Sequence, residues 1–125
     1  MNNAVKDAQL EHTQIDAVLA HATGTPMGDE AEAEAIMSCF PLDTHVVATK
    51  GHTGHECWMA GVSQAVQAVL MLRHDFLPGV VGTNDCDFEM LNLVRDTFDF
   101  SAQHILCNAF GFGGTNSSFI ISKPY

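Results

Sequence analysis

Short apolar segments alternate with helix-forming segments along most of this 125-residue chain. The predicted strands cover residues 15–20, 46–48, 105–109 and 117–122. The predicted helices cover residues 1–11, 30–40 and 56–73, and the last carries apolar residues on nearly every side, as a helix buried inside a layered domain does. Residues 77–99 contain many turn residues and are predicted to be mostly irregular. This alternation indicates a layered α/β fold with a mainly parallel sheet.

Composition limits the number of domains and the classes of partner. Hydrophobic residues make up 46% of the chain, which suffices for one core, and we expect a single domain over residues 1–125. The formal charge of −10 argues against direct contact with nucleic acid or an anionic membrane surface. No stretch of about 18 residues is apolar enough to span a membrane. The four cysteines are scattered and follow no signal peptide, so reduced thiols in a cytoplasmic protein are expected.

Three polar loops follow predicted strands, at the place where open α/β sheets usually carry their sites. They cover His21–Pro26, Lys50–His55 and Phe110–Asn116. Lys50 is an isolated cation among neutral neighbours. His55 is expected at the start of a helix, whose positive end would keep the imidazole neutral and able to donate a hydrogen bond to an oxyanion. A single histidine at a strand end is more often structural than catalytic, so the three loops have to be considered together.

Other chemical interpretations of these residues are weaker. His52, His55 and Cys57 could ligate zinc, but they supply three ligands where a structural site needs four. The glycine-rich loop lacks the Lys-Ser/Thr ending of a phosphate-binding loop and leads into a strand. Asp29 and Glu32 could form an acid/base pair, but their position at the start of a helix is better explained by capping, with Asp29 as the cap. Both carboxylates are therefore predicted to be structural.

The order and spacing of the three loops resemble the C-terminal part of the β-ketoacyl-acyl carrier protein synthases, the condensing enzymes of fatty-acid and polyketide synthesis. Residues His21–Pro26 read His-Ala-Thr-Gly-Thr-Pro and resemble the family's His-Gly-Thr-x-Thr-Pro. Residues Lys50–His55 read Lys-Gly-His-Thr-Gly-His and resemble Lys-Ser-x-x-Gly-His. Residues Phe110–Asn116 resemble the family's closing Phe-Gly-Phe-Gly-Gly-Thr-Asn without change. The resemblance covers essentially the whole chain.

The resemblance implies a thiolase-like half-domain and the decarboxylative Claisen condensation of malonyl-carrier protein with an acyl thioester. It implies that His21 and His55 donate hydrogen bonds to the thioester carbonyl and that Lys50 tunes the electrostatics around His55. The implied substrate contacts are Thr23 and Thr25 on the phosphopantetheine arm, and Phe112 with Gly113 at a gate beside the nucleophile. Substrates would arrive on acyl carrier protein, with no metal or other cofactor.

The chain also departs from the family pattern. The family's nucleophilic cysteine lies in an N-terminal half that this chain does not match, and Cys57 is expected to be inert inside a buried helix. A central strand of the half-domain is expected to be missing, which would leave a gap or exposed edges in the sheet. Gln64 stands where the family has a glutamate that pairs with the lysine. Trp58 and Ala22 each stand where the family has a glycine. The change to Ala22 is expected to be mild if its backbone angles are ordinary.

Two functions follow from these residues. In the first, the chain is the C-terminal portion of a condensing enzyme and acts only with a cysteine-bearing N-terminal half, in a homodimer or heterodimer. In the second, it is a non-catalytic module that binds acyl carrier protein or a synthase subunit, although its acidic surface disfavours an acidic carrier.

Overall fold

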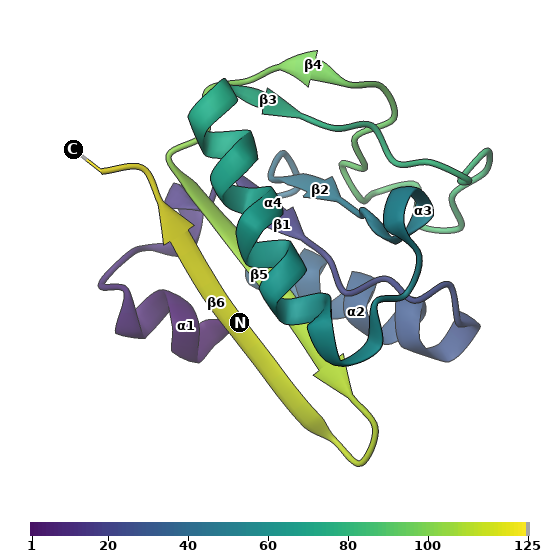
Figure 1. Ribbon diagram of the computed structural model, residues 1–125. Coiled ribbons are helices and arrows are strands. Elements are labelled where there is room, and N and C mark those ends of the chain that lie inside the picture. The colour runs from purple at the N-terminus through teal and green to yellow at the C-terminus, as the bar shows by residue number, and fades with distance from the viewer. Residues whose placement is uncertain (125) are drawn as a thin grey trace.

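The computed structural model describes residues 1–124, which form a four-stranded sheet with helices on both faces (Figure 1). The strands are β1 (Ala17–Leu19), β2 (His45–Val47), β5 (His104–Gly111) and β6 (Thr115–Ser122). Their order in the sheet is β2-β1-β5-β6. Strands β2, β1 and β5 are parallel, and only β6 runs antiparallel. The predicted α/β architecture with a mainly parallel sheet is therefore confirmed.

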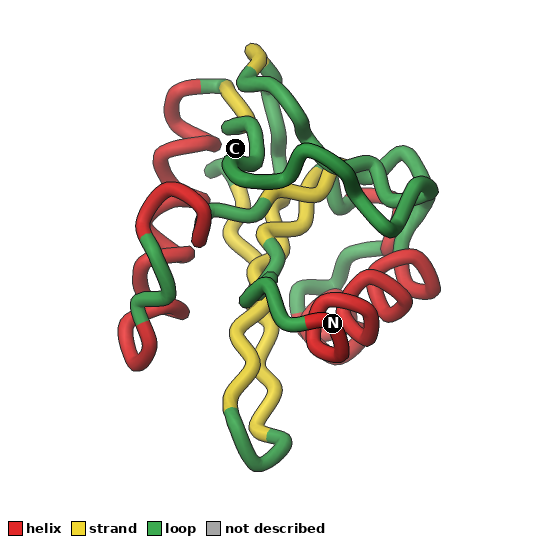
Figure 2. The backbone as a smooth tube through the Cα atoms, turned by 90° about the vertical axis from the view of Figure 1, so that its right-hand side faces the viewer, coloured by secondary structure: helices red, strands yellow, loops and turns green. Residues whose placement is uncertain are grey.

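The centre of the sheet is continuous. Ala17 of β1 pairs with His45 on one side and with Ile105 on the other, so the prediction of a missing central strand is wrong. Within residues 1–124, β6 pairs with β5 alone and presents its other side as an edge. The β5–β6 hairpin also projects beyond the rest of the sheet (Figure 2). The strand order places any exposed backbone at the margin of the sheet instead of its middle.

Two apolar clusters hold the helices to opposite faces of the sheet. Helices α1 (Asn2–Asp7) and α2 (Pro26–Cys39) cover one face, and α4 (Ala60–His74) covers the other (Figure 2). Alternate residues of β1 divide between the clusters: Leu19 packs in the cluster that includes Met71 of α4, and Val18 in the one that includes Ile36 of α2. This alternation is the ordinary consequence of side chains pointing to opposite faces along a strand.

Several helix boundaries differ from those predicted. Helix α1 ends at Asp7, and α2 begins at Pro26, so the N-cap of α2 is Thr25 and not Asp29. Proline suits the first turn of a helix because its missing N–H has no helical acceptor to lose. A short helix, α3 (Lys50–Thr53), forms within the predicted second loop. A 3₁₀ turn, Cys57–Met59, then precedes α4.

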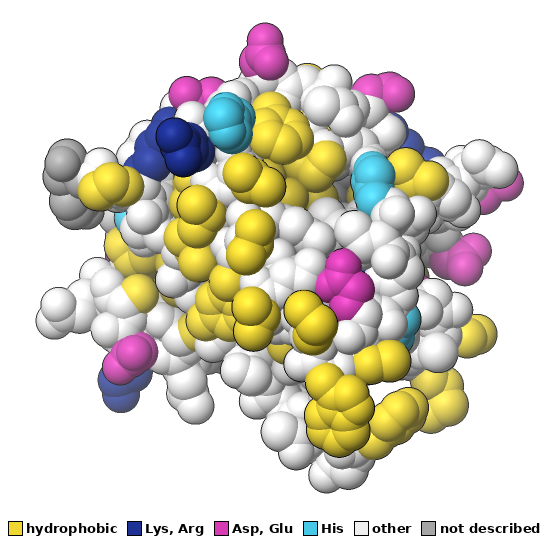
Figure 3. Space-filling view, viewed as in Figure 1, with side chains coloured by type: hydrophobic (Ala, Val, Ile, Leu, Met, Phe, Trp, Pro, Cys, Tyr) yellow, Lys and Arg dark blue, Asp and Glu magenta, His cyan; other side chains and the backbone are white. Residues whose placement is uncertain are grey.

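The outward face of α4 is exposed, which contradicts the prediction of a helix buried on all sides. Val62 is 67% exposed, Val66 55% and Val69 47%. Trp58 and Met59 continue the apolar surface ahead of the helix, and Figure 3 shows apolar side chains gathered on this side of the molecule. We call these five residues the α4 face. The sequence of α4 has the pattern of a buried helix. Within residues 1–124, however, no layer covers the outward side of α4.

The long segment between β3 (Phe76–Leu77) and β4 (Phe98–Asp99) is irregular, as predicted. Asn92 anchors it to the sheet by donating to the carbonyl oxygen of Asp43 and to Nδ1 of His45. The His45 ring in turn packs edge-on against the ring of Phe98. None of the helices in the described part of the chain is long and apolar enough to cross a bilayer.

Candidate active site

The three polar loops meet at the carboxyl ends of β1, β2 and β5. The His21 ring, after β1, lies edge-on to the His55 ring with 5.8 Å between their centroids. The ring of Phe110, in β5, lies 5.5 Å from the His21 ring. Parallel strands bring their carboxyl ends to one edge of the sheet, so residues distant in sequence come together there. The structure therefore unites the two histidines that the sequence singled out.

Lys50 ties the second loop to the first. Its Nζ donates to the carbonyl oxygen of His21 and lies 3.4 Å from Nδ1 of the same residue. An ammonium group can only donate, so Nδ1 of His21 accepts and the ring carries its proton on Nε2. Lys50 thus selects the tautomer of His21 as well as holding its backbone.

Glu32 of α2 holds the His21 loop from the opposite side. Its side chain is buried, and its carboxylate accepts the backbone N–H groups of His21 and Ala22, each at 2.8 Å. It also accepts from Nδ2 of the buried Asn108 at 2.9 Å. The structural role predicted for Glu32 is therefore right, but the capping explanation is wrong, because Glu32 binds a loop and a strand. Asp29 likewise accepts from the N–H of Gly24, at 3.1 Å, within the same loop.

Ala22 occupies a backbone conformation that favours glycine. Its φ is +38°, so the ordinary angle that would make this substitution mild is not present. The left-handed region costs a residue with a Cβ about 1–2 kcal/mol relative to glycine. The hydrogen bond from the Ala22 N–H to Glu32 contributes to holding the residue in this conformation.

The tautomer of His55 is set by the chain that follows it. Nδ1 of His55 accepts the backbone N–H of Cys57 at 3.0 Å, which leaves the ring proton on Nε2. The prediction that His55 begins a helix is wrong, because it lies between α3 and the 3₁₀ turn and α4 starts only at Ala60. A local N–H donor, and not a helix terminus, therefore determines which ring nitrogen carries the proton. Both histidines therefore have Nδ1 engaged and an Nε2–H available for donation.

The charges around the site also favour a neutral His21. Burial, then the positive charge of Lys50, then His55, lower the pKa of His21 from 6.5 to about 4. Burial lowers the pKa of Lys50, and the carboxylates of Glu32, Glu56 and Asp29 oppose that change. At neutral pH His21 is therefore an uncharged hydrogen-bond donor beside a cation.

This lowered pKa predicts a loss of stability in mild acid. Because the unfolded chain binds a proton on His21 below pH 6.5 and the folded chain does so only near pH 4, the free energy of unfolding should decrease as the pH falls through this window. Above pH 6.5 the contribution is constant. Urea titrations of the wild type and of His21→Gln across pH 4–7 measure the effect. We expect a flatter pH dependence for His21→Gln than for the exposed control His74→Gln, and equal curves for the two variants would contradict the prediction.

Within residues 1–124, no hydrogen bond or ring contact joins the side chains of the remaining predicted site residues to His21 or His55. The Oγ1 atoms of Thr23 and Thr25 lie 3.2 Å apart at the start of α2. Phe112 and Gly113 form the tip of the β5–β6 hairpin, and the Phe112 ring is fully exposed. The aromatic ring that packs on His21 is that of Phe110, which the sequence reasoning did not single out. The available signal was its position in the sequence, directly after the predicted strand 105–109 and directly before Gly111.

The comparisons with known proteins agree with this arrangement. The family model described as "Beta-ketoacyl synthase, C-terminal domain" matches residues 1–84. The chain belongs to the β-ketoacyl synthase family. It is 38% identical over 114 residues to 3-oxoacyl-[acyl-carrier-protein] synthase 1 of Escherichia coli K12, a match that covers 89% of this chain and 28% of the relative. The chain thus spans less than a third of the length of that synthase.

Solved ketosynthase structures share the fold. The structure titled "The ishigamide ketosynthase/chain length factor" superposes with a TM-score of 0.94 at 26% identity, over 99% of this chain and 32% of the other. The ketosynthase ApeO of Xenorhabdus doucetiae, solved in complex with its chain length factor ApeC, superposes with a TM-score of 0.88 at 30% identity, over 98% and 32%. The C-terminal synthase domain described here therefore has the thiolase-like ketosynthase fold.

The structure also locates Cys57 and Gln64, two residues that the sequence analysis of this synthase domain singled out. Cys57 is exposed in the 3₁₀ turn, so the prediction that it sits inside a buried helix is wrong. Gln64 of α4 is buried, and its Nε2 donates to the carbonyl oxygen of Ala20, the residue before His21. Its amide therefore supports the start of the His21 loop directly.

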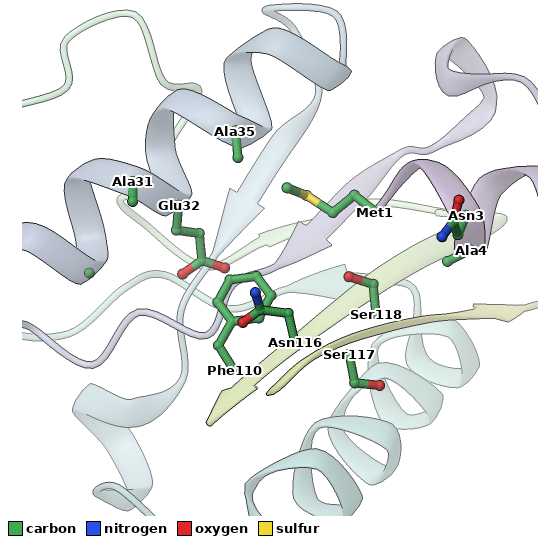
Figure 4. Close-up of a pocket in the computed structure, with 11 residues that line it drawn as sticks. Met1, Asn3, Ala4, Ala31, Glu32, Ala35, Phe110, Asn116, Ser117 and Ser118 are labelled. Atoms are coloured by element: carbon green, nitrogen blue, oxygen red, sulfur yellow. The ribbon is translucent and has the colours of Figure 1, made fainter. Parts of the chain in front are cut away.

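A hollow of about 610 Å³ adjoins the site between α1, α2 and the β5–β6 hairpin (Figure 4). Glu32 and Phe110, which both contact His21, form part of its wall together with Asn116 and Ser118. The Met1 side chain points into it from α1 (Figure 4). No three His, Cys, Asp or Glu side chains of residues 1–124 are grouped in a way that could hold a metal ion.

Proposed function

We propose that this domain supplies the two catalytic histidines of a β-ketoacyl-acyl carrier protein synthase. The observation that carries the proposal is the pair of neighbouring imidazoles, each with Nδ1 engaged and Nε2–H free. Two neighbouring N–H donors suit a carbonyl oxygen that becomes negatively charged during the reaction. Lys50 fixes the tautomer of His21, and burial together with the charge of Lys50 lowers the pKa of that ring.

The proposed reaction begins with malonyl-carrier protein. The bond between the α-carbon and its carboxylate breaks, carbon dioxide leaves, and the bonding electrons become the enolate of the thioester. His21 and His55 donate to the enolate oxygen and lower the energy of this step. The α-carbon then forms a bond to the acyl carbonyl carbon held on a cysteine of the complementary half, and that cysteine leaves as thiolate. Thr23 and Thr25 would contact the phosphopantetheine arm, and Phe112 with Gly113 would form the gate, with no further cofactor.

The proposed partner is the cysteine-bearing N-terminal half of a synthase. The α4 face and the edge of β6 are the surfaces open to it. Within residues 1–124 no layer covers the apolar face of α4, and β6 is paired on one side only, with β5. Acyl carrier protein would deliver both substrates. Similar ketosynthases are solved with a chain length factor, which is consistent with a heterodimer, and a homodimer is the other assembly we consider. We place the protein in the cytoplasm, where its four free cysteines would stay reduced.

Reconstitution tests this function. The chain is co-expressed with the cysteine-bearing N-terminal part of Escherichia coli synthase 1, and condensation is followed as carbon dioxide release from malonyl-carrier protein with an acyl donor. We expect activity from the purified complex and none from either part alone. A stable complex without condensation would overturn the catalytic proposal.

A non-catalytic carrier-binding module is the second candidate function. The observation in its favour is Gln64, since the family's glutamate is replaced by a neutral side chain committed to Ala20. Titration of the chain with acyl carrier protein distinguishes the two. Saturable binding together with an inactive reconstituted complex would favour the module, and no binding would exclude it.

A further inference from the structure

A small, partly open cavity borders Lys50. Lys50, Thr53, Glu56, Ser63 and Gln64 line it, and its volume is about 10 Å³. This volume is about what one water molecule requires, provided that polar partners surround it. The cavity lies between α3 and the first turn of α4.

Two groups at this cavity have hydrogen-bonding capacity left over. Lys50 has three ammonium N–H groups, and its hydrogen bonds within residues 1–124 go to the carbonyl oxygen and to Nδ1 of His21. Gln64 uses Nε2 on Ala20, while its buried Oε1 finds no partner among the described residues. A buried carbonyl oxygen left unpaired costs about 1–3 kcal/mol. One donor and one acceptor thus face the same small space unsatisfied.

Glu56 supplies a negative charge at the same cavity. Hydrogen bonds from Ser63 and then Thr53 lower the pKa of Glu56, so it is ionised at neutral pH. Ser63 also accepts from Nε2 of Gln67 at 3.1 Å, and Gln67 Oε1 accepts from the hydroxyl of Thr49 at 2.7 Å. This chain of donors fixes the direction of the Ser63 hydroxyl toward Glu56. The Ser63 and Thr53 hydroxyls therefore stabilise the ionised carboxylate at the edge of the cavity.

We propose that one water in this cavity accepts from Lys50 and donates to Gln64 Oε1 and to Glu56, which makes Glu56 the positioning residue of Lys50. The two water protons satisfy the two acceptors, and a water oxygen takes the third ammonium N–H. Glu56 replaces the glutamate that the family carries at the position of Gln64. The titratable and charged groups facing Lys50 are then His21, Glu32, Glu56 and Asp29.

The amide at position 64 fits this division of roles. A carboxylate there has no N–H to donate to the carbonyl oxygen of Ala20, whereas glutamine anchors Ala20 and leaves the counter-charge to Glu56. The site thus keeps a cationic Lys50 beside His21 while gaining a direct bond to the His21 loop. The catalytic consequence rests on the proposed function, but the water and the pairing do not.

Titration of Lys50 in the full chain tests the inference. The chain has three lysines, so the ¹³Cε and ¹⁵Nζ signals of Lys6, Lys50 and Lys123 can be followed separately by NMR. We expect Glu56→Gln to shift the titration of Lys50 to lower pH, and Glu56→Asp, which keeps the charge, to leave it near the wild type. Glu89→Gln, an exposed acid far along the chain, is the matched control. The double variant Glu56→Gln with Gln64→Glu should return the titration toward that of the wild type.

The inference is overturned if Glu56→Gln leaves the Lys50 titration unchanged, or if it shifts no more than Glu89→Gln does. A high-resolution crystal structure with an empty cavity would contradict the proposal that a water molecule lies there. These measurements need neither the N-terminal half nor condensation activity. An inactive reconstituted complex would therefore overturn the proposed function and leave this inference standing. An unchanged titration of Lys50 would overturn this inference and leave the proposed function standing.

Discussion

Replacing Glu32 by alanine should lower the free energy of unfolding by about 3 kcal/mol. The substitution removes an acceptor from the N–H groups of His21 and Ala22 and from the buried amide of Asn108. Hydrogen bonds to charged groups contribute about 1.5–3 kcal/mol each, and water can reach the two loop N–H groups but not Asn108. Urea denaturation monitored by circular dichroism measures the change, read from the midpoint at constant m-value.

Glu34→Ala is the control for this experiment. Glu34 lies on the same helix and is exposed. Because the substitution is again glutamate to alanine, it changes the helix propensity by the same amount. We expect it to stay within about 0.5 kcal/mol of the wild type. Equal effects of Glu32→Ala and Glu34→Ala would mean that the carboxylate does not hold the His21 loop.

Replacing His55 by alanine in the reconstituted complex should lower kcat for condensation by about 10²–10³-fold, with little change in KM. Its Nε2–H is a donor directed at charge that develops only in the transition state, because Nδ1 is occupied by the N–H of Cys57. His55 is exposed in the domain alone, so the urea midpoint of the variant should match that of the wild type. The two measurements together separate a chemical effect from an unfolding effect.

His74→Ala provides the matched control, since His74 is exposed at the end of α4 and contributes nothing to the site. It should retain the wild-type rate. A His55→Ala complex that keeps a third or more of the wild-type rate would contradict the role given to His55.

The main residues of the candidate site could be found from the sequence because each belongs to a polar loop that follows a predicted strand. Polar residues directly after a short apolar run predict side chains at the carboxyl end of a strand, and parallel strands bring these ends together. His21, Lys50 and His55 follow this rule, and the structure places them in contact. The overall α/β architecture follows from the same alternation of segments.

Other features depend on contacts that no local pattern encodes. The order of the strands was not predicted, and a strand was expected to be missing from the middle of the sheet, because apolar runs indicate that β1 and β5 are buried but not that they are neighbours. Glu32 looks like any acidic residue in the first turns of a helix, and only the packing of α2 turns it toward Ala22. The apolar pattern of α4 predicted a helix buried on all sides, but a pattern cannot tell whether a further layer packs on its outward face, which is exposed in residues 1–124.

The link from Lys50 to the carbonyl oxygen of His21 has a consequence for how this family can diverge. The Lys50 side chain from the second loop donates to the backbone of the first loop. A sequence change that moves either loop therefore alters the geometry of this hydrogen bond. Substitutions in the two loops should therefore show epistasis, with pairs tolerated where the single changes are not. Families of synthases would then exchange these two loops together more readily than one at a time.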